Sequence, residues 1–596
     1  MISAILILHF TTGGDTFFRQ QSRRNLSGPA NPYPAFCGGK TKTEKTNALA
    51  RSCSQEKFHS DRYSTIIEFN NSEFQVEEVR PQTTGTYHRI QGTGDRIQRT
   101  ENREQRQESR EGFYYEPLNP ITDLSRDGTG RDNRIVGTTF EIGKPELPGI
   151  FQMLGIPNNA SYQVKIIEIE TDTIKGLIIY PLQPPTTENR DWGLGIGDYT
   201  TAFGDWEFVI DRDFYNSDIL YPASPVCIDN PGVWRDVNVA ILRIYPFAYN
   251  PIDSTLIVYK RLIVQISYSM FSSLKVASNY YRMYKSELLN FESMNVEEDK
   301  GDSVKYLVIA YDSLLPAIMP LVDWHHKRGI DIEVVPVCSV GITAQEIKSY
   351  IANKYYTNGL DYVLLVGDIE HIPLYNWDSY PSQYWYACIT GDSTPDMYPD
   401  LAIGRLSVKD TAELANQVNK TLTYMKVPLL DDWLTKSILC AHKETSPDNY
   451  ATFKENIRKY EYDYFNPTFD TVYGRSDGTT AQLISAINEG RNIINYRGHG
   501  STTSWAAWDC NGGYLQDTEV KLLTNIRTPI VLNMCCATGD IGSLSDCLCE
   551  TWMKAVGGAV AAYGVTRSTN TEPHNIFDEH FYKAFGNVLP GIFDVG

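Results

Sequence analysis

Residues 491–500 read RNIINYRGHG and residues 528–540 read TPIVLNMCCATGD. Each stretch begins with a short apolar run, which is typical of a strand buried on both faces of a parallel sheet. Each run ends in residues that can carry chemistry, His499 in one and the pair Cys535 and Cys536 in the other. In an open α/β sheet such residues gather where the parallel strands end. The two stretches therefore predict neighbouring strands with a site at their carboxyl ends.

The alternation of apolar runs and amphipathic helical patterns continues upstream of these strands. YLVIAY, DIEVVPV and DYVLLVGD are separated by two helical patterns, and DLAIGRL is followed by a third. The rhythm restarts with KSILCAH at residue 436 and runs through the two stretches above. Strands that alternate with helices indicate parallel sheets covered by helices. We expect two consecutive α/β subdomains with mainly parallel sheets, at 305–430 and 431–596.

The first half of the chain has a different pattern. From residue 135 onward, short runs rich in Val, Ile, Tyr and Thr are bounded by Pro, Asn, Gly and Asp, which is typical of strands. With the strand-like run at 64–79, they predict a β-rich domain over 63–272, built as a sandwich. Residues 1–62 are expected to be a leader without a fold, and 97–134 to be flexible linkers, because both lack hydrophobic periodicity.

Residues 273–304 are expected to link the β-rich and α/β parts. The polar, acidic stretch 290–302 within them suits an exposed hinge that a protease could cut. At 596 residues, the chain is long enough for about three to five compact units. We therefore expect a multidomain protein with a cleavable segment ahead of its α/β half.

Composition excludes several classes of protein. The net charge of -19 repels nucleic acid, so nucleic acid is not an expected partner. Eleven Cys residues are too sparse for a disulfide scaffold, and no paired CxxC motifs predict a zinc site. No apolar stretch reaches the ~18 residues of a transmembrane helix. The chain should fold without crossing a membrane.

The Cys and His at neighbouring strand ends can act together as a nucleophile and a base. A thiol attacks as thiolate, and a nearby imidazole can take its proton. Cys535 and Cys536 point opposite ways if both continue a strand, so local pattern does not choose between them. The amides of Gly500 and Cys536 are the natural N–H donors for an oxyanion.

At these residues the chain resembles the gingipain-type cysteine peptidases, peptidase family C25, which are relatives of caspases and legumains. YVLLVGD, the turn at 403–405, NYRGHGS and CATGD occur in the family's order over 305–596. The resemblance implies a caspase-like fold and a cysteine endopeptidase that works through a thioester. The family spaces its nucleophile three residues before Gly-Asp, which selects Cys536 and leaves Cys535 as a packed strand residue.

The resemblance also suggests further site residues. Family members place a carboxylate beside the catalytic His, in the loop after the first strand of the second subdomain. Glu444 takes this place here, with Asp448 as the alternative because the spacing is one residue shorter than expected. Ala451 stands where Arg-cleaving members carry an acid, so specificity for Arg is not expected. Thr566 is assigned to the substrate-binding surface. His442 ends a strand and is expected to be a surface or packing residue, with a place beside the site as the alternative.

The β-rich half, with its ELPGIF motif, resembles the family's propeptide. This implies a zymogen whose own prodomain inhibits it, a protein or peptide substrate, and a secreted or cell-surface bacterial protein. No cofactor is required for such chemistry. Structural calcium is compatible with the family. Asp509, Asn511 and Asp517 do not have the spacing of an EF-hand, so no residues are assigned as metal ligands.

Two other functions stay open on sequence grounds. The same acyl-enzyme could pass its acyl group to an amine, as a sortase-like transpeptidase does. The chain could also be a catalytically silent adhesion or binding protein. The presence of both Cys536 and His499 argues against this, because packing of a core does not require that pair. The chain ends soon after His580, where relatives continue, so we expect it to be truncated relative to the family.

Overall fold

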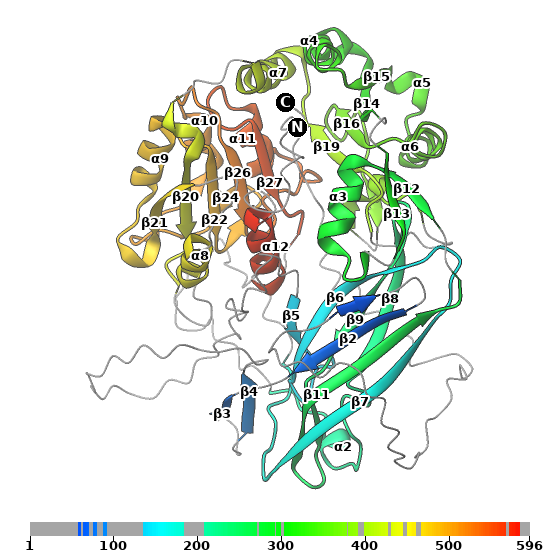
Figure 1. The fold of residues 1–596 in the computed structure, drawn as a ribbon. Coiled ribbons are helices and arrows are strands. Elements are labelled where there is room, and N and C mark those ends of the chain that lie inside the picture. Colours follow the sequence, from blue (N-terminus) through cyan, green and yellow to red (C-terminus); the bar gives the residue numbers. More distant parts are fainter. Residues whose placement is uncertain are drawn as a thin grey trace.

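The fold has a β-rich part and two α/β parts, which lie above it in the view of Figure 1. The computed structural model describes residues 58–60, 64–70, 75–79, 87–91, 135–183, 208–270, 273–291, 294–299, 303–377, 380–390, 398–426, 431–444, 450–459, 467–567 and 571–583.

The β-rich part contains two antiparallel sheets that share one buried cluster. Alternate residues of the long strand β11, Leu262, Val264 and Ile266, are buried against Leu154 and Leu242 of the other sheet. This period of two is what a sheet with one face in a core requires. The first sheet has the order β1-β2-β11-β10 with β7 also on β11, and comprises β1 (Phe58–Ser60), β2 (Ser64–Asn70), β7 (Tyr162–Lys175), β10 (Phe247–Asn250) and β11 (Thr255–Tyr268). The second has the order β5-β6-β9-β8, and comprises β5 (Ile135–Thr138), β6 (Pro148–Ile156), β8 (Val226–Trp234) and β9 (Val237–Ile244). The smaller elements are the pair β3 (Gln75–Val79) and β4 (Tyr87–Gln91), and α2 (Arg212–Tyr215).

The start of the β-rich part lies earlier than the sequence predicts. Strand β1 lies inside the expected leader, 1–62, and pairs with β2. The β-rich part therefore includes the end of that leader. Strand β2 in turn pairs with β11, which is far away in the sequence. The rest of the predicted leader, up to residue 57, and the linker at 97–134 lie outside the described residues.

Most of the segment predicted as a linker, 273–304, forms regular structure. It contains β12 (Leu274–Ala277), α3 (Ser278–Glu287) and β13 (Val296–Asp299), and β12 and β13 pair in parallel. The side chain of Asn290 exchanges two hydrogen bonds of 2.8 Å with the backbone of Gly155 in β6. This segment therefore packs on the β-rich part. A linker was expected from its polar stretch, but a few apolar side chains, such as Val276, Tyr284 and Leu288, pack against β9 and hold it.

The first α/β part is a four-stranded parallel sheet in the order β15-β14-β16-β19. It comprises β14 (Lys305–Ala310), β15 (Asp331–Pro336), β16 (Tyr362–Val366) and β19 (Ala402–Leu406), with α4 (Leu315–Lys327), α5 (Val337–Val340), α6 (Ala344–Asn358), α7 (Thr411–Lys426) and the hairpin of β17 (Tyr375–Trp377) and β18 (Tyr380–Ser382).

The second α/β part is a five-stranded parallel sheet in the order β21-β20-β22-β26-β27. It comprises β20 (Lys436–Ala441), β21 (Thr468–Tyr473), β22 (Ile493–Arg497), β26 (Ile530–Met534) and β27 (Ala561–Gly564), with α8 (Tyr450–Lys459), α9 (Thr480–Glu489), α10 (Asp517–Lys521), α11 (Leu548–Lys554), α12 (Thr571–Lys583) and the short strands β23 (Gly500–Ser501), β24 (Ser504–Trp505) and β25 (Leu515–Gln516).

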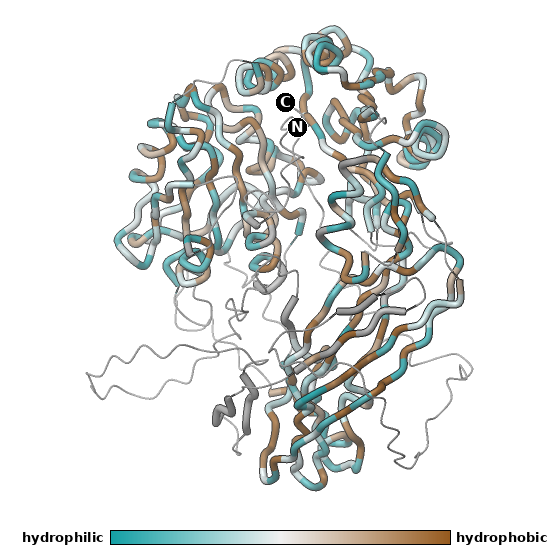
Figure 2. The backbone as a smooth tube through the Cα atoms, in the orientation of Figure 1, coloured by the Kyte–Doolittle hydropathy of each residue, from teal (hydrophilic) through white to brown (hydrophobic). Residues whose placement is uncertain are grey.

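Both faces of the second sheet are buried, as parallel strands require. Ile438 and Cys440 of β20 lie in one core cluster, while Leu439 and Ala441 lie in another with residues of α8. The first of these clusters continues into α4 and α7 of the first α/β part, so one core joins the two sheets. Figure 2 shows hydrophobic residues along the strands of these sheets. The mainly parallel α/β architecture expected after residue 305 is therefore present.

Candidate active site

Three adjacent strands bring the predicted catalytic residues to one edge of the second sheet. Strand β22 lies between β20 and β26, and all three are parallel. Their last residues, Ala441, Arg497 and Met534, are in register. Glu444, His499 and Cys536 follow these residues by two or three positions, so they leave the sheet at the same level.

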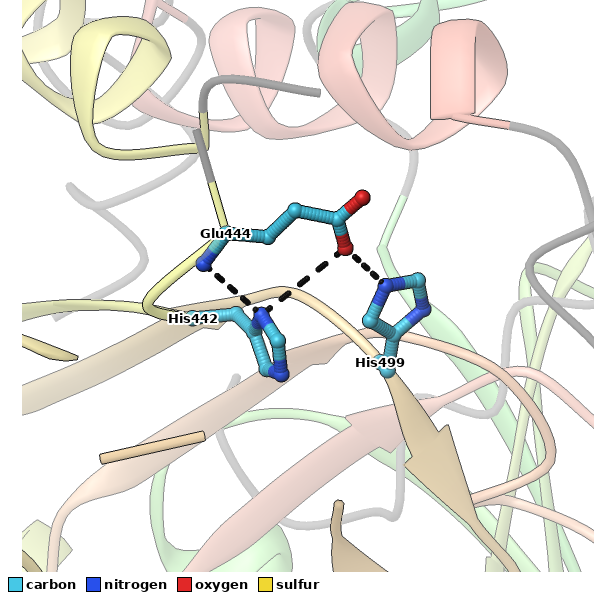
Figure 3. A group of neighbouring side chains, drawn as sticks. All are labelled: His442, Glu444 and His499. Carbon is cyan, nitrogen blue, oxygen red and sulfur yellow. Dashed lines mark hydrogen bonds and ion pairs between the residues drawn. The ribbon is translucent and has the colours of Figure 1, made fainter. Parts of the chain in front are cut away.

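Glu444 and His499 are in direct contact. Oε2 of Glu444 lies 2.5 Å from Nε2 of His499, and both side chains are largely buried (Figure 3). A carboxylate on one imidazole nitrogen fixes the ring orientation and stabilises the imidazolium form. If Nε2 carries the proton that Glu444 accepts, Nδ1 is the nitrogen able to take a proton from a thiol. The geometry supports Glu444 as the orienting carboxylate, while the alternative, Asp448, lies outside the described residues.

His442 borders this pair, which the sequence left open beside a surface or packing role. Its Nδ1 accepts a hydrogen bond of 3.1 Å from the backbone N–H of Glu444, and its ring centroid lies 4.8 Å from that of His499. Burial, followed by the charges of His499 and Lys443, lowers the pKa of His442 to about 3. His442 is therefore neutral and holds the backbone that carries Glu444. The only sequence signal was its place directly after a buried strand.

Cys535 and Cys536 differ in their surroundings. Cys535 continues the parity of Val531 and shares its core cluster, and its Sγ lies 3.7 Å from Oγ1 of Thr538. Cys536 lies in the bend that follows β26 and is not part of that core cluster. The chain turns directly afterwards, because Ala537 has a φ of 57°. Cys535 therefore packs in the core, the assignment of Cys536 as the nucleophile stays a prediction, and the side chains of both are fully buried.

Gly500 lets the loop of His499 lie against the cysteine turn. A Cβ at this position would lie 2.6 Å from Sγ of Cys535 and 2.8 Å from the carbonyl oxygen of Cys536. Contacts this short are not tolerated, so only glycine fits. The close approach brings the amides of Gly500 and Cys536, the predicted oxyanion donors, into one small region.

The two residues predicted to bind substrate lie in different environments. Thr566 follows β27 next to Arg567, whose carbonyl oxygen accepts a hydrogen bond of 3.2 Å from the N–H of Ala537. It thus lies beside the cysteine turn. Ala451 lies in α8 with an exposed fraction of 0% and packs into the core. In this form of the chain, Ala451 offers no surface to a ligand.

The loop considered for calcium is held by its own carboxylate. Asp509 accepts hydrogen bonds from the N–H groups of Thr480, Asn511 and Gly513. Burial would raise the pKa of Asp509, but these hydrogen bonds outweigh it and lower the pKa. Because N–H donors already occupy its oxygens, this carboxylate is poorly placed to ligate a cation.

Within the described residues, two groups of side chains place three ligand atoms within 4.8 Å of one another: His442 with Glu444 and His499, and Asp368 with Asp546 and Glu550. The first group consists of the Glu444–His499 pair described above and the adjacent His442. In the second group, the carboxylates are also engaged with Ser407, Lys409 and Lys554.

Comparison with known proteins agrees with the order of these parts. Residues 299–591 match Peptidase family C25, and residues 136–297 match Propeptide_C25. Gingipain R2 of Porphyromonas gingivalis is 27% identical over 443 residues, which cover 70% of this chain and 56% of that protein. Lys-gingipain of the same organism is 25% identical over 489 residues, which cover 76% of this chain and 26% of that protein. The chain thus spans little more than half of the first relative.

The crystal structure of the Arg specific cysteine proteinase gingipain R is 27% identical, with a TM-score of 0.44 over 48% of this chain and 68% of that one. Among the helices of the described ranges, none is both long and apolar enough to cross a membrane. The two family matches follow one another without overlap and cover the β-rich part from residue 136 onward and both α/β parts. The chain therefore belongs to peptidase family C25, with the family's propeptide ahead of its peptidase domain.

Proposed function

We propose that this chain is a cysteine endopeptidase made as a zymogen. The observation that carries the proposal is the contact of Glu444 with His499 at a strand end directly beside the strand that leads to Cys536. Carboxylate, imidazole and thiol in this order form a nucleophile, its base and the group that orients the base.

A residue of the chain can carry out each step of the proposed reaction. Nδ1 of His499 takes the thiol proton of Cys536, and the thiolate attacks the peptide carbonyl carbon. The amides of Gly500 and Cys536 stabilise the oxyanion. The C–N bond breaks as His499 protonates the leaving amine, which leaves a thioester. Water, deprotonated by His499, then releases the carboxylic acid and restores the thiol.

Release of new N-termini from a denatured protein by the cleaved chain is the direct test of this proposal. Capture of the acyl group by an added amine would favour the transpeptidase alternative. No reaction of any kind, with Cys536 intact, would favour a silent binding protein. Thiol, imidazole and carboxylate supply every step, so no cofactor is proposed, and structural calcium remains a prediction.

We further propose that the propeptide is a β-sandwich that holds a caspase-like peptidase domain latent. The core shared by the two antiparallel sheets supports the sandwich, and the two parallel sheets joined through α4 and α7 support the two-subdomain arrangement. The complete burial of Cys536 fits a latent state. Secretion or display on a bacterial surface is proposed from the bacterial relatives.

Removal of the propeptide is expected to raise the peptidase activity at least tenfold, because a latent site must be uncovered before substrate can reach Cys536. The inhibitory unit should be 58–299 rather than 135–272, since β2 completes the sheet of β11 and Asn290 is bonded to β6. A chain that begins at Asp302 should therefore cleave faster than the full chain, and adding 58–299 separately should suppress it. Equal rates for the short and full chains would remove the propeptide from the explanation of latency.

Peptides with Arg or Lys at P1 are expected to be poor substrates, at least tenfold below apolar P1. The resemblance places Ala451 at the position of the acid of Arg-cleaving members, and a buried cation without a partner is costly. The prediction rests on this missing carboxylate and not on contact of the substrate with Ala451, which is buried. Values of kcat/KM for peptides that differ only at P1 measure this. A preference for basic P1 of about a hundredfold would mean that another carboxylate lines the pocket, and Glu455 and Asp448 would be replaced first.

A further inference from the structure

The hairpin of β8 and β9 ends in a tight turn that carries an unusual arginine. Only Arg235 and Asp236 separate the two strands. Arg235 has a φ of 55°, in the left-handed region that side chains other than glycine seldom occupy. Such a conformation persists where the surroundings hold it in place. Although it lies at the tip of a hairpin, Arg235 is only 8% exposed. The tip is therefore inserted into another part of the molecule.

The guanidinium of Arg235 enters the first α/β part. Nη1 donates hydrogen bonds of 2.9 and 3.0 Å to the carbonyl oxygens of Leu360 and Asp400. Nη2 donates to the carbonyl oxygen of Gly359 at 3.3 Å and lies 3.0 Å from Oδ1 of Asp361. We call Gly359, Leu360, Asp361 and Asp400 the Arg235 socket. These residues lie where α6 ends and where β16 and β19 begin.

The socket suits a guanidinium in both charge and shape. Gly359 caps the carboxyl end of α6, where the helix dipole is negative. Asp361 adds a full negative charge, and the guanidinium carbon lies 3.9 Å from the ring of Tyr280 and 5.3 Å from that of Tyr355. Burial alone would lower the pKa of Arg235, but Tyr280, Asp361 and Asp236 raise it, so the side chain stays charged. A planar fork of donors meets these acceptors in a way that the single ammonium of lysine cannot.

The surrounding contacts join the same two parts. Oγ1 of Thr390 donates to the carbonyl oxygen of Val233 in β8 at 3.3 Å. The hydroxyl of Tyr284 in α3 donates to the carbonyl oxygen of Trp234 at 3.0 Å, so α3 also holds the hairpin. The hairpin tip thus forms hydrogen bonds both with the peptidase domain and with α3, near the end of the propeptide.

We propose that Arg235 is the residue that anchors the propeptide to the peptidase domain, with the socket as its docking site. The inference deepens the proposed zymogen function and rests on it for the role of the β-rich part. Glu444, His499 and Cys536 all lie on the second sheet, whereas the socket lies on the first. The affinity of the propeptide and the blocking of the catalytic residues are therefore carried by different residues.

The test uses the full chain with Cys536→Ala, so that no self-cleavage intervenes and the result does not depend on catalysis. A recognition sequence for a site-specific protease is inserted between Asp299 and Ser303, the intact protein is cut there, and the dissociation constant of the two fragments is measured by dilution. Arg235→Ala should raise this constant at least about a hundredfold, as expected when one partner of a buried, hydrogen-bonded charge pair is removed. Arg235→Lys should recover only part of the loss, because the fork is missing.

Arg243→Ala is the matched control. Arg243 is also buried and pairs with Asp229 at 2.8 Å beside the rings of Phe140 and Phe151, all within the β-rich part. Its loss should change the dissociation constant less than threefold.

A second variant, Asp361→Asn, acts from the peptidase side and should weaken binding at least tenfold. It keeps the test decisive if Arg235→Ala does not fold. Its effect should also not add to that of Arg235→Ala, since both remove one interaction. A constant within threefold of the parent for either variant would overturn the proposal.

Discussion

Replacement of Cys536 by alanine should lower the kcat/KM of the cleaved chain for a peptide substrate by at least about 10⁴-fold. The thiolate forms the only covalent bond to the substrate in the proposed mechanism, so no other group can take over its step. Cys535→Ala should retain a substantial part of the activity. Its side chain lies in the core beside Thr538.

The adjacent cysteines make this pair of variants an internal control. Both side chains are buried, and both changes remove one thiol from the same turn. A general loss of folding would affect the two variants alike, and near-ultraviolet circular dichroism would detect it. If Cys535→Ala were inactive while Cys536→Ala kept its activity, the assignment of the nucleophile would be reversed.

Replacement of Glu444 by glutamine should lower kcat by about 10² to 10⁴-fold with little change in KM. The amide keeps the size of the side chain, but it loses the charge that stabilises the imidazolium of His499. Initial rates at saturating substrate measure the effect. Because the carboxylate contacts the imidazole and not the thiol, Glu444→Gln should keep a thiol that an alkylating agent can still label.

Glu489→Gln is the control for this change. Glu489 ends α9 in the same subdomain, is exposed, and pairs with Arg491 rather than with His499. It should leave kcat within about twofold, since the contribution of an exposed ion pair is small. A Glu444→Gln variant within fivefold of the parent would mean that another carboxylate orients the imidazole, and Asp448 would then be tested.

Much of the α/β half could be predicted because its strands are continuous apolar runs. Buried parallel strands such as β20 and β26 need apolar side chains on both faces, and their short length and their alternation with helical patterns distinguish them from buried helices. The strand ends then brought His499 and Cys536 to one edge. The choice between Cys535 and Cys536 needed more than the strand pattern, because it depends on how the chain turns at Ala537.

Other features could not be predicted because they depend on contacts between distant residues. The neutral state of His442 follows from burial by several elements, which its neighbours in sequence do not specify. The stretch 290–302 is polar and acidic, yet the pairing of β12 with β13 and the hydrogen bonds of Asn290 hold the segment that contains it. The socket of Arg235 combines a helix end with two strand starts, and nothing around Arg235 in the sequence indicates it.

The most direct test of the central claim is the mass of the acyl-enzyme. The cleaved chain is mixed with a peptide ester substrate, quenched in acid within the first turnover, and digested for mass spectrometry. The proposed mechanism predicts an adduct with the mass of the acyl group on Cys536, which disappears in Cys536→Ala and persists in Cys535→Ala. Hydrolysis without any adduct, or an adduct on Cys535, would contradict it.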